Sequence, residues 1–444
     1  MPLRIPARIS WAVVLGLLAN FAAKGQMRTA PQLDQLSIEE LLNVQVLSPT
    51  KAKAMSTRRS PGAVRVFTRQ DIERYGFVTL RDLLATVPGA QIQEYRVGHE
   101  AVWIRGIKQR YNNKILWLID GVPIRDSYYG HTNIDEVLPL HVVERIEILN
   151  GPGGVLYGSN AFSGVVSITT KREGRSMRFN SGSFRSVGGA LEFSGPGVYV
   201  STDYQASGGF SPLLNSDGGA YRHAQDRDRS FGLLKMEHGG FQGSVSFTRH
   251  KFADAYRKAN EDRFWIRSPI FGSLSYDKKI GDGGSFGVRG YYEDYDVYRD
   301  KIRYTTAGQL RDTTRSTLGG SLYGVDLTGS FELGAHTLVA GSSFQGDKDA
   351  GPEELTFFPT PRRGPGLAVA SVRRHNLGSF VQDIWSLNEH LDFTAGVRYD
   401  YLSDFKDQLS YRVGLTGQRG LFYGKLLYGT AFRVPSFREY LEVP

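Results

Sequence analysis

Residues 391–401 of the chain read LDFTAGVRYDY, a run in which every second side chain is apolar or aromatic. The intervening side chains are polar, charged or small, so a strand over this run has one apolar face and one polar face. A membrane-spanning strand of a β-barrel needs roughly 9–11 residues, whereas strands of soluble sandwiches average about 5–6. The length of the run therefore favours a membrane β-barrel.

The same alternation recurs over residues 241–248, and Tyr residues such as Tyr291, Tyr292, Tyr399 and Tyr401 suit the aromatic girdle of such a barrel. Gly contributes 52 of the 444 residues, about 12 %, against roughly 7 % in average chains. This composition favours many strands and turns over helix bundles.

Four polar stretches separate the strand candidates, and we expect residues 211–229, 251–269, 297–314 and 346–374 to be long loops outside the cell. Their aromatic, Arg and Lys side chains can bind an anionic, ring-bearing ligand by stacking and ion pairing, although solvated loop decoration explains them equally well. The nine His residues form no close cluster, so we expect no metal site. The candidates for ligand contact are Tyr256, Trp265, Tyr298, Phe357 and Arg362.

The net charge of +9 is concentrated near the N-terminus, since residues 1–60 hold 8 basic and 3 acidic residues. The excess does not form a stripe over a folded surface, and we expect no nucleic-acid partner. The chain has no Cys, which excludes disulfides, zinc knuckles and thiol nucleophiles.

The N-terminus has the three-part pattern of a secretory signal peptide. Arg4 and Arg8 precede an uncharged run from residue 9 to residue 23, and Ala23 and Gly25 form a small-x-small cleavage site before Gln26. A short buried helix or a membrane anchor is the alternative, but the run is shorter than the roughly 20 residues that a membrane helix needs. We therefore expect residues 1–25 to be removed on export.

Residues 61–172 predict a small mixed α/β unit. Thr68 and Thr79 each stand three residues before an Asp, as at the start of a capped helix. Strands are expected at residues 64–67, 101–105, 115–119 and 145–149. The Gly-rich segment from Gly151 matches neither the P-loop nor the dinucleotide-binding pattern, so nucleotide binding is not expected.

Four blocks in this unit, in this order and spacing, resemble the plug domain of TonB-dependent outer-membrane receptors. They are residues 103–106 (WIRG), 118–123 (LIDGVP), 145–152 (RIEILNGP) and 156–171 (LYGSNAFSGVVSITTK). In the usual pattern Asn stands at the position of Ser167 and an alanine-like residue at that of Gly153. The matching residues are Arg105, Gly106, Asp120, Gly121, Arg145, Glu147, Gly151, Pro152, Tyr157 and Gly158.

The resemblance implies an α/β plug inside an antiparallel transmembrane β-barrel of the cell outer membrane, with the Arg105 and Arg145 regions facing the barrel wall. Ordinary strand-end surface pairs are the alternative for these two arginines. It implies a receptor rather than an enzyme, without a cofactor of its own. The implied partners are the TonB energy-transducing complex, a small-molecule chelate, outer-membrane lipid and the barrel-assembly machinery.

A segment ahead of the plug resembles the TonB box, through which such receptors take up energy by β-augmentation. It is the β-prone run Val44, Gln45, Val46, Leu47 and Ser48, and an incidental apolar run in a linker is the alternative. We expect residues 26–60 to form the energy-coupling segment, 61–172 the plug and 173–444 part of the barrel.

The 272 residues after residue 172 suffice for roughly 14 strands. A plug of this size has a radius of about 17 Å, whereas 14 strands leave a lumen of about 9 Å and 22 strands one of about 17 Å. We therefore expect a C-terminally truncated chain that holds roughly 14 of 22 strands. The block from Tyr428 to Tyr440 also resembles one that occurs within the family's barrels.

The expected function is active uptake of a scarce nutrient chelate, with a ferric siderophore favoured over cobalamin, haem or an oligosaccharide. His131, His223 and His375 are candidates for contact with a haem-like ligand. A non-energised outer-membrane channel or adhesin is the competing hypothesis. A hydrolase is disfavoured, because no nucleophile-elbow pattern G-x-S-x-G surrounds the candidate serines.

Overall fold

The computed structural model describes residues 45–46, 55–96, 99–108, 111–133, 138–209, 227–253, 261–305, 307–351, 353–358, 360, 362–363 and 371–441. The predicted signal peptide lies outside these residues, as do Val44, Leu47, Ser48, Tyr256 and His223. Within the described ranges, no helix combines the length and the hydropathy needed to cross a membrane.

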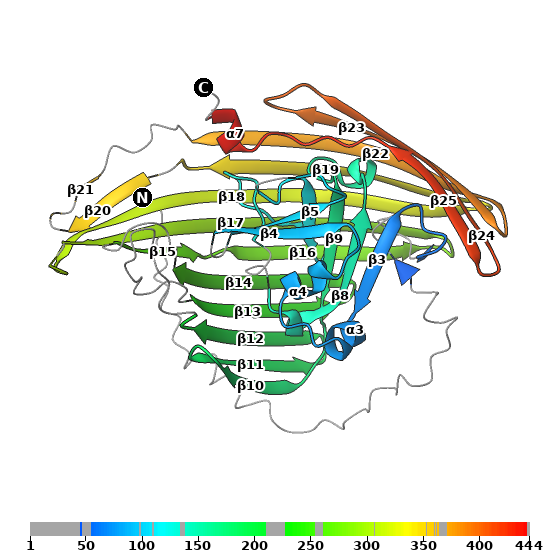
Figure 1. Cartoon of the computed structure of the whole chain (residues 1–444). Helices are drawn as coiled ribbons and strands as arrows, with labels where there is room; N and C mark the ends of the chain where they lie inside the picture. The colour runs from blue at the N-terminus through cyan, green and yellow to red at the C-terminus, as the bar shows by residue number, and fades with distance from the viewer. Residues whose placement is uncertain are drawn as a thin grey trace. The chain divides into compact units, whose positions relative to one another are not determined.

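The N-terminal part contains a mixed α/β unit, as predicted, and we call residues 57–171 the plug (Figure 1). Its main sheet has the order β3-β8-β9-β6-β7, in which only β6 and β9 run parallel, and β4 and β5 form a separate hairpin. A short pair, β1 Gln45–Val46 and β2 Met55–Ser56, precedes the plug. The plug elements are β3 Ala63–Thr68, α3 Arg69–Arg74, α4 Leu80–Ala85, β4 Ala90–Arg96, β5 His99–Ile104, β6 Ile115–Ile119, β7 Val122–Pro123, the 3-10 helix η2 Leu140–Val142, β8 Val143–Asn150, α6 Gly154–Tyr157 and β9 Gly164–Thr170.

Two capping boxes start the first two helices of the plug, as the sequence predicts. The hydroxyl of Thr68 accepts the amide hydrogen of Asp71, and the Asp71 carboxylate accepts the amide hydrogen of Thr68. Thr79 and Asp82 repeat this exchange at the start of α4. Each box satisfies two donors that a helix start otherwise leaves without partners. Helix α4 ends at Ala85.

The strands that follow the plug form one large antiparallel sheet of 16 strand segments in the described residues, which we call the wall. Strands β10 and β25 lie at its two margins. The segments are β10 Ser176–Gly182, β11 Ser186–Gly195, β12 Val198–Ser207, β13 Arg227–His238, β14 Phe241–Ala253, β15 Glu261–Arg267, β16 Ile270–Ile280, β17 Gly284–Tyr304, β18 Leu310–Leu333, β19 His336–Asp349, β20 Glu353–Phe358, β21 Arg362–Arg363, β22 Val372–Asn388, β23 Leu391–Leu402, β24 Gln408–Arg419 and β25 Phe422–Gly429.

Strands β15 and β16 together occupy a single place between β14 and β17. The ladder breaks at Pro269, which has no amide hydrogen to donate to a neighbouring strand. The carbonyl of Pro269 still accepts the amide hydrogen of Thr248 at 3.0 Å. With β15 and β16 as one broken strand, the described sheet is 13 strands wide, close to the predicted 14.

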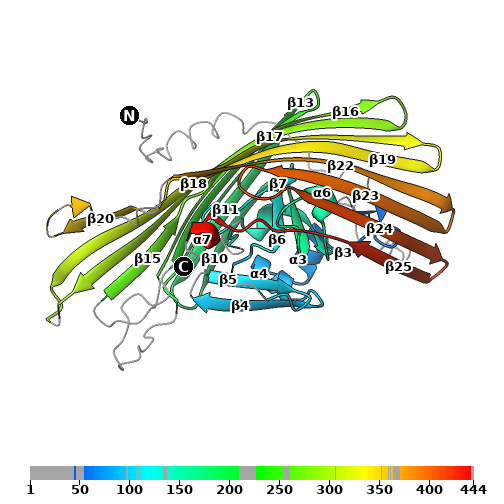
Figure 2. The ribbon, with the colours of Figure 1, turned by 90° about the horizontal axis from the view of Figure 1, so that it is seen from above.

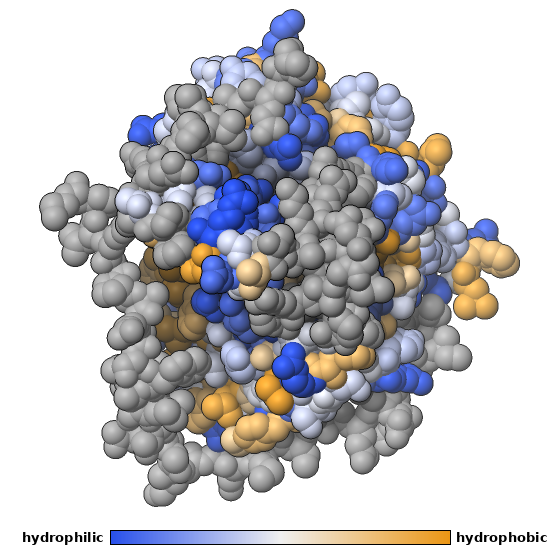
Figure 3. Space-filling view, turned by 60° about the vertical axis from the view of Figure 1, so that its left-hand side comes forward, coloured by the Kyte–Doolittle hydropathy of each residue, from blue (hydrophilic) through white to orange (hydrophobic). Residues whose placement is uncertain are grey.

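Burial along the wall strands is reversed relative to a soluble protein. In β23, Val397 and Tyr399 expose 41 % and 50 % of their surface, whereas Arg398 and Asp400 are almost completely buried. Hydrophobic residues consequently lie on the molecular surface beside hydrophilic ones (Figure 3). The apolar face of the wall therefore points outward and its polar face points toward the plug, the arrangement of a membrane barrel.

The plug lies against the concave, polar face of the curved wall (Figures 1 and 2). Its hydrophobic core continues into aromatic residues on that face, including Tyr199, Phe231, Phe271 and Tyr291. Plug and wall thus share one core.

The connections between wall strands differ in length at the two ends of the sheet. At one end, which we call the short-turn end, β13 and β14 are joined by residues 239–240 and β18 and β19 by residues 334–335. At the other, the long-connection end, residues 208–226 join β12 to β13 and residues 350–371 lie between β19 and β22.

Three of the predicted loops are wrong for part of their length. Strand β17 extends to Tyr304 and β18 begins at Leu310, so most of the predicted loop 297–314 is a long hairpin. Likewise β15 and β20 lie within the predicted loops 251–269 and 346–374. Beyond the membrane both faces of a strand meet water, so the alternation that identifies a strand in sequence disappears there.

The outward-facing pattern predicts a depth-dependent effect of charge. Val397→Lys places an ammonium group near the middle of the lipid-facing band and should lower the free energy of unfolding by about 2–4 kcal/mol, whereas Tyr401→Lys, near the strand end, should cost about 0–1 kcal/mol. Denaturant unfolding from lipid vesicles measures both. Equal effects at the two positions would contradict the assigned lipid-facing band.

Candidate functional site

The family-like motifs of the plug form its tight turns. Arg105 and Gly106 both have positive φ after β5, and Asp120 and Gly121 have positive φ between β6 and β7. The Arg289 guanidinium packs against Gly121 so closely that no Cβ fits, and it donates to the Gly121 carbonyl at 3.3 Å. Gly is required here by the turn, because its φ of +81° is strained for residues with a Cβ.

Asp120 links the plug to the wall. Its carboxylate accepts hydrogen bonds from the amide and the hydroxyl of Thr170, at 2.9 and 2.6 Å. The ammonium group of Lys235, on β13, lies 3.1 Å from the same carboxylate. A turn motif recognisable in sequence therefore also serves as a contact with the wall.

The described contacts of Arg105 and Arg145 lie within the plug rather than against the wall. The Arg105 guanidinium lies beside Gly151, and Arg145 pairs with Glu147, two residues along the same strand. These contacts favour the alternative in which both arginines make ordinary contacts at strand ends instead of facing the wall.

Helix α6 and the glycines around it contact the wall directly. A Cβ at Gly158 would lie 2.8 Å from the Arg398 guanidinium, and one at Gly154 would lie 2.9 Å from the backbone of Ala431. Tyr157 is partly buried against Leu156 and its neighbours, and burial raises its pKa. Pro152 lies beside Gly429 at the end of β25. The motif over residues 151–158 is therefore a docking surface for the last described strands.

The chain entering the plug is anchored at the short-turn end. Arg59 forms a two-pronged ion pair with the buried carboxylate of Asp392, at 2.8 and 2.5 Å. The ammonium group of Lys425 donates to the carbonyl oxygens of Thr57, Ser60 and Gly62 at 2.6–2.9 Å. No local sequence pattern indicates this anchor, because its partners are more than 300 residues apart.

A buried ion pair holds the segment after β7. The Arg125 guanidinium donates to both carboxylate oxygens of Asp347, on β19, at 2.9 and 2.7 Å. Next to it, Asp126 accepts the amide hydrogens of Tyr129 and His131 at 2.6 and 3.0 Å. Burial raises the pKa of Asp126 to about 7. This segment is thus fixed to the wall and internally hydrogen-bonded.

Aromatic and basic side chains converge where the plug faces the long-connection end. Arg438, on α7 Phe437–Leu441, donates to the Tyr111 hydroxyl and lies 5.1 Å from the centre of the Tyr129 ring. On the wall, the guanidinium groups of Arg299 and Arg267 lie 5.6 and 5.8 Å from the centre of the Trp265 ring. We call these six residues, Tyr111, Tyr129, Trp265, Arg267, Arg299 and Arg438, the apex cluster.

The charges of arginines from both halves of the apex cluster act on Tyr129. Burial raises the pKa of the Tyr129 hydroxyl, while the nearby positive charges of Arg438 and Arg299 oppose the rise. Tyr111, Tyr129, Arg299 and Arg438 are only partly buried, whereas Trp265 is 6 % exposed. Trp265 therefore packs against the guanidinium groups, and the four partly buried members keep part of their surface exposed.

The predicted ligand candidates separate onto two faces of the wall. Trp265 pairs in register with Arg299 on the inner face, whereas Tyr298 lies on the outer face. Arg315 lies between Tyr298 and Phe357, 5.1 and 5.7 Å from the two ring centres, and is held by Asp300. The backbone of Arg362 lies in β21, and the structure does not describe its side chain. Only Trp265 joins the apex cluster.

His131 is engaged within the plug. Its Nδ1 accepts the Asn112 amide hydrogen at 3.2 Å, and its Nε2 lies 2.5 Å from the Asn133 amide oxygen. Nε2 therefore carries the proton, and neither nitrogen points to a ligand site. His375 stacks on the lipid-facing Phe344. Within the described part of the chain, no group of three or more His, Cys, Asp or Glu residues could hold a metal ion.

Comparison with known proteins matches both parts of this architecture. Residues 56–165 match the TonB-dependent Receptor Plug Domain, and residues 203–442 match the TonB dependent receptor-like β-barrel. The chain belongs to the TonB-dependent receptor family. Members of this family are receptors and transporters of the outer membrane rather than enzymes, and this chain is an outer-membrane protein. In barrels of this kind, long loops face outward from the cell and short turns face the periplasm.

Two curated relatives are the vitamin B12 transporter BtuB of Vibrio vulnificus, 26 % identical, and the iron-regulated outer membrane virulence protein of Vibrio cholerae, 24 % identical. The matches cover 85 % and 98 % of this chain but 61 % and 65 % of the relatives. The siderophore receptor PirA of Acinetobacter baumannii has the same fold, with a TM-score of 0.62, 16 % identity and coverage of 86 % of this chain and 62 % of PirA. The pyoverdine receptor FpvA of Pseudomonas aeruginosa matches with a TM-score of 0.66 and 13 % identity, and the match covers 85 % of this chain and 63 % of FpvA.

The Arg125–Asp347 pair predicts a coupled stability effect. Arg125→Met leaves a buried carboxylate without its guanidinium and should destabilise the docked plug by about 3–5 kcal/mol. The double variant Arg125→Met/Asp347→Leu should recover most of this loss, since both charges are then absent. Thermal unfolding in detergent, followed by limited proteolysis of the plug, measures the coupling. Additive losses in the double variant would show that the pair is not coupled.

Proposed function

We propose that the protein is an energised uptake receptor for a scarce anionic chelate, with a ferric siderophore as the favoured ligand. The observation that carries the proposal is the apex cluster, in which guanidinium groups and aromatic rings meet at the outward-facing end of the plug. Guanidinium groups bind anionic oxygens with directed hydrogen bonds, and aromatic faces stack on planar ligand rings. This combination suits a chelate with both features.

Cobalamin and haem are the alternative ligands. The names of the similar proteins point in both directions, since BtuB is a vitamin B12 transporter whereas PirA and FpvA are siderophore receptors. The positive charge of Arg299 and Arg438 favours an anionic ligand over cobalamin. Growth of a receptor-deficient strain carrying this receptor, with ferric enterobactin, ferric pyoverdine, ferric yersiniabactin, haem or cobalamin as the sole source of the limiting nutrient, tests the assignment. Growth on cobalamin alone would overturn the preference.

The proposed energy-coupling segment is residues 44–48. Its two described residues, Gln45 and Val46, are extended and already pair with Met55 and Ser56 in an antiparallel bridge. A segment that forms such a bridge can also pair with the edge strand of a partner, as β-augmentation requires. The TonB complex is the proposed partner, and outer-membrane lipid and the barrel-assembly machinery belong to the same proposal.

Charge removal on the two faces of the long hairpin distinguishes the inner ligand site from the outer one. Arg299→Gln should weaken binding of the transported chelate roughly 10- to 100-fold, because a charge-assisted hydrogen bond contributes about 1.5–3 kcal/mol. Arg315→Gln, on the outer face of the same hairpin, is the matched control and should leave the affinity unchanged. Equilibrium binding to whole cells measures both. The reverse result would place the ligand beside Tyr298 and Phe357.

The coupling segment predicts a separation of binding from transport. Val46→Pro removes the amide hydrogen that strand pairing needs and should abolish uptake while surface binding of the chelate persists. Met55→Pro disrupts the β1–β2 bridge from the other side and should leave uptake intact. Uptake that survives Val46→Pro, or that persists after the proton gradient is collapsed, would favour a non-energised channel. Loss of uptake in both variants would assign the effect to the internal bridge.

A further inference from the structure

The inner face of the wall carries a row of alternating rings and charges that leads away from the apex cluster. From Trp265 the row continues through Arg267 to Phe252, with the Arg267 guanidinium 5.0 Å from the Phe252 ring centre. His250 follows, its ring centre 5.1 Å from that of Phe252. These residues lie on neighbouring strands β15 and β14. The row ends at His250, at the edge of a cavity.

The cavity has a volume of about 680 Å³ and lies between the plug and the inner faces of strands β10 to β13. Ligand pockets of proteins commonly have about 300–1,000 Å³, so it is large enough for a chelate. The plug contributes α3, residues 76–80 and residues 138–141. The wall contributes mostly polar side chains, among them Arg178, Asn180, Asp203, Gln205, Arg227 and Arg229.

The charges of the lining favour an anionic occupant. Its carboxylates already have cationic partners, since Glu73 pairs with Arg69 at 2.7 Å, Asp203 with Arg229 at 2.9 Å and Asp228 with Arg249 at 2.9 Å. Arg227, at the long-connection end of β13, is exposed and has no carboxylate partner within the described ranges. The amide groups of Asn180 and Gln205 bond to each other and add neutral donors and acceptors.

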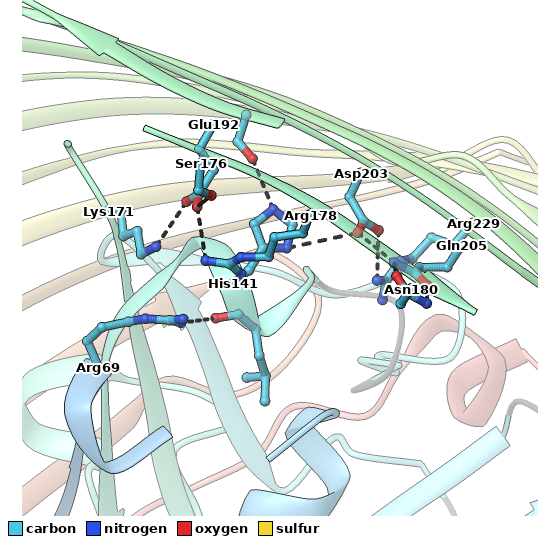
Figure 4. A network of polar contacts seen from close by, with 12 residues as sticks. Arg69, His141, Lys171, Ser176, Arg178, Asn180, Glu192, Asp203, Gln205 and Arg229 are labelled. Atoms are coloured by element: carbon cyan, nitrogen blue, oxygen red, sulfur yellow. Dashed lines mark hydrogen bonds and ion pairs between the residues drawn. The ribbon is translucent and has the colours of Figure 1, made fainter. Parts of the chain in front are cut away.

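A network of polar contacts joins the plug to the wall beside the cavity (Figure 4). His141 Nε2 lies 3.1 Å from the Ser201 hydroxyl, and Lys171 pairs with Glu192 at 3.0 Å. Glu192 also accepts hydrogen bonds from Ser176 and Tyr199. His141 and Lys171 belong to the plug and their partners to the wall. A movement of the plug relative to the wall therefore breaks these bonds without breaking any strand pairing of the wall.

We propose that this cavity is a second binding chamber for the anionic chelate, reached from the apex cluster along the row Trp265, Arg267, Phe252 and His250 and closed toward the periplasm by the contacts of His141 and Lys171. The role of the chamber in transport rests on the uptake function proposed above. The access of small anions to the chamber does not depend on that function, so the transport role and the anion access can be tested separately.

Thiol labelling tests the chamber without any chelate, since the chain has no Cys of its own. Gln205→Cys places a thiol in the lining, and Leu191→Cys, on the lipid-facing side of the neighbouring strand, is the matched control. In whole cells the anionic reagent 2-sulfonatoethyl methanethiosulfonate should modify Cys at position 205 at least about threefold faster than the cationic trimethylammonium analogue. The control should be nearly unreactive with both.

Two further variants link this reactivity to the cavity. Arg227→Gln should reduce the preference for the anionic reagent, and Ala190→Trp, which fills the space beside Arg178 and Asp203, should suppress labelling of Gln205→Cys. Equal rates for the two reagents, or labelling that persists beside Ala190→Trp, would overturn the anion-admitting chamber.

The transport role is tested with the ⁵⁵Fe-labelled enterobactin, pyoverdine or yersiniabactin chelate that supports growth. Ala190→Trp should reduce its uptake about tenfold and leave surface binding unchanged, whereas Leu191→Trp should change neither. Normal uptake by Ala190→Trp would overturn the chamber as a transit site. If none of these chelates supports growth of the parent, the proposed function fails while the labelling result still decides the chamber.

Discussion

The polar inner face of the wall is the constraint on which the rest of the structure depends. A strand that turns its apolar side chains toward lipid must turn polar ones inward, and here that face buries charges such as Arg398, Asp400 and Asp392. Buried charges need partners, because transfer from water into a protein interior is costly. Some partners are neighbours on the wall, as for Arg398 and Asp400, and others come from the plug, as for Asp392 and Arg59. The plug is thus both a stopper and the counterpart of the wall's charge.

Local features of the fold could be predicted from the sequence, whereas long-range ones could not. The helix starts at Thr68 and Thr79 and the strand over residues 391–401 depend on residues a few positions apart, and the structure confirms them. The Arg125–Asp347 pair joins residues 222 positions apart, and no local pattern indicates it. The extension of β17 to Tyr304 was missed for a different reason, since alternation vanishes where both faces of a strand are polar.

The candidate site shows the same division. Trp265 is conspicuous in sequence as an aromatic residue among basic ones, but its neighbour Arg299 is identified only by the register of β15 with β17. Arg438 reaches Tyr129 because residues 430–441 fold back over the plug, where Arg374 donates to the carbonyl of Pro435 at 2.8 Å. Composition could therefore name the chemistry of the site, but strand register decides which of its residues share a face.

The contact of Lys425 with the carbonyls of Thr57, Ser60 and Gly62 has a mechanical consequence. These carbonyls lie between the proposed coupling segment and β3, in series along the backbone. Tension applied from the periplasm must therefore displace them from the ammonium group before any load reaches the plug sheet. After the β1–β2 bridge, the next contacts to yield are those of Lys425 and the Arg59–Asp392 ion pair, which can reform when the pull ends, and β3 remains paired with β8 until they have opened.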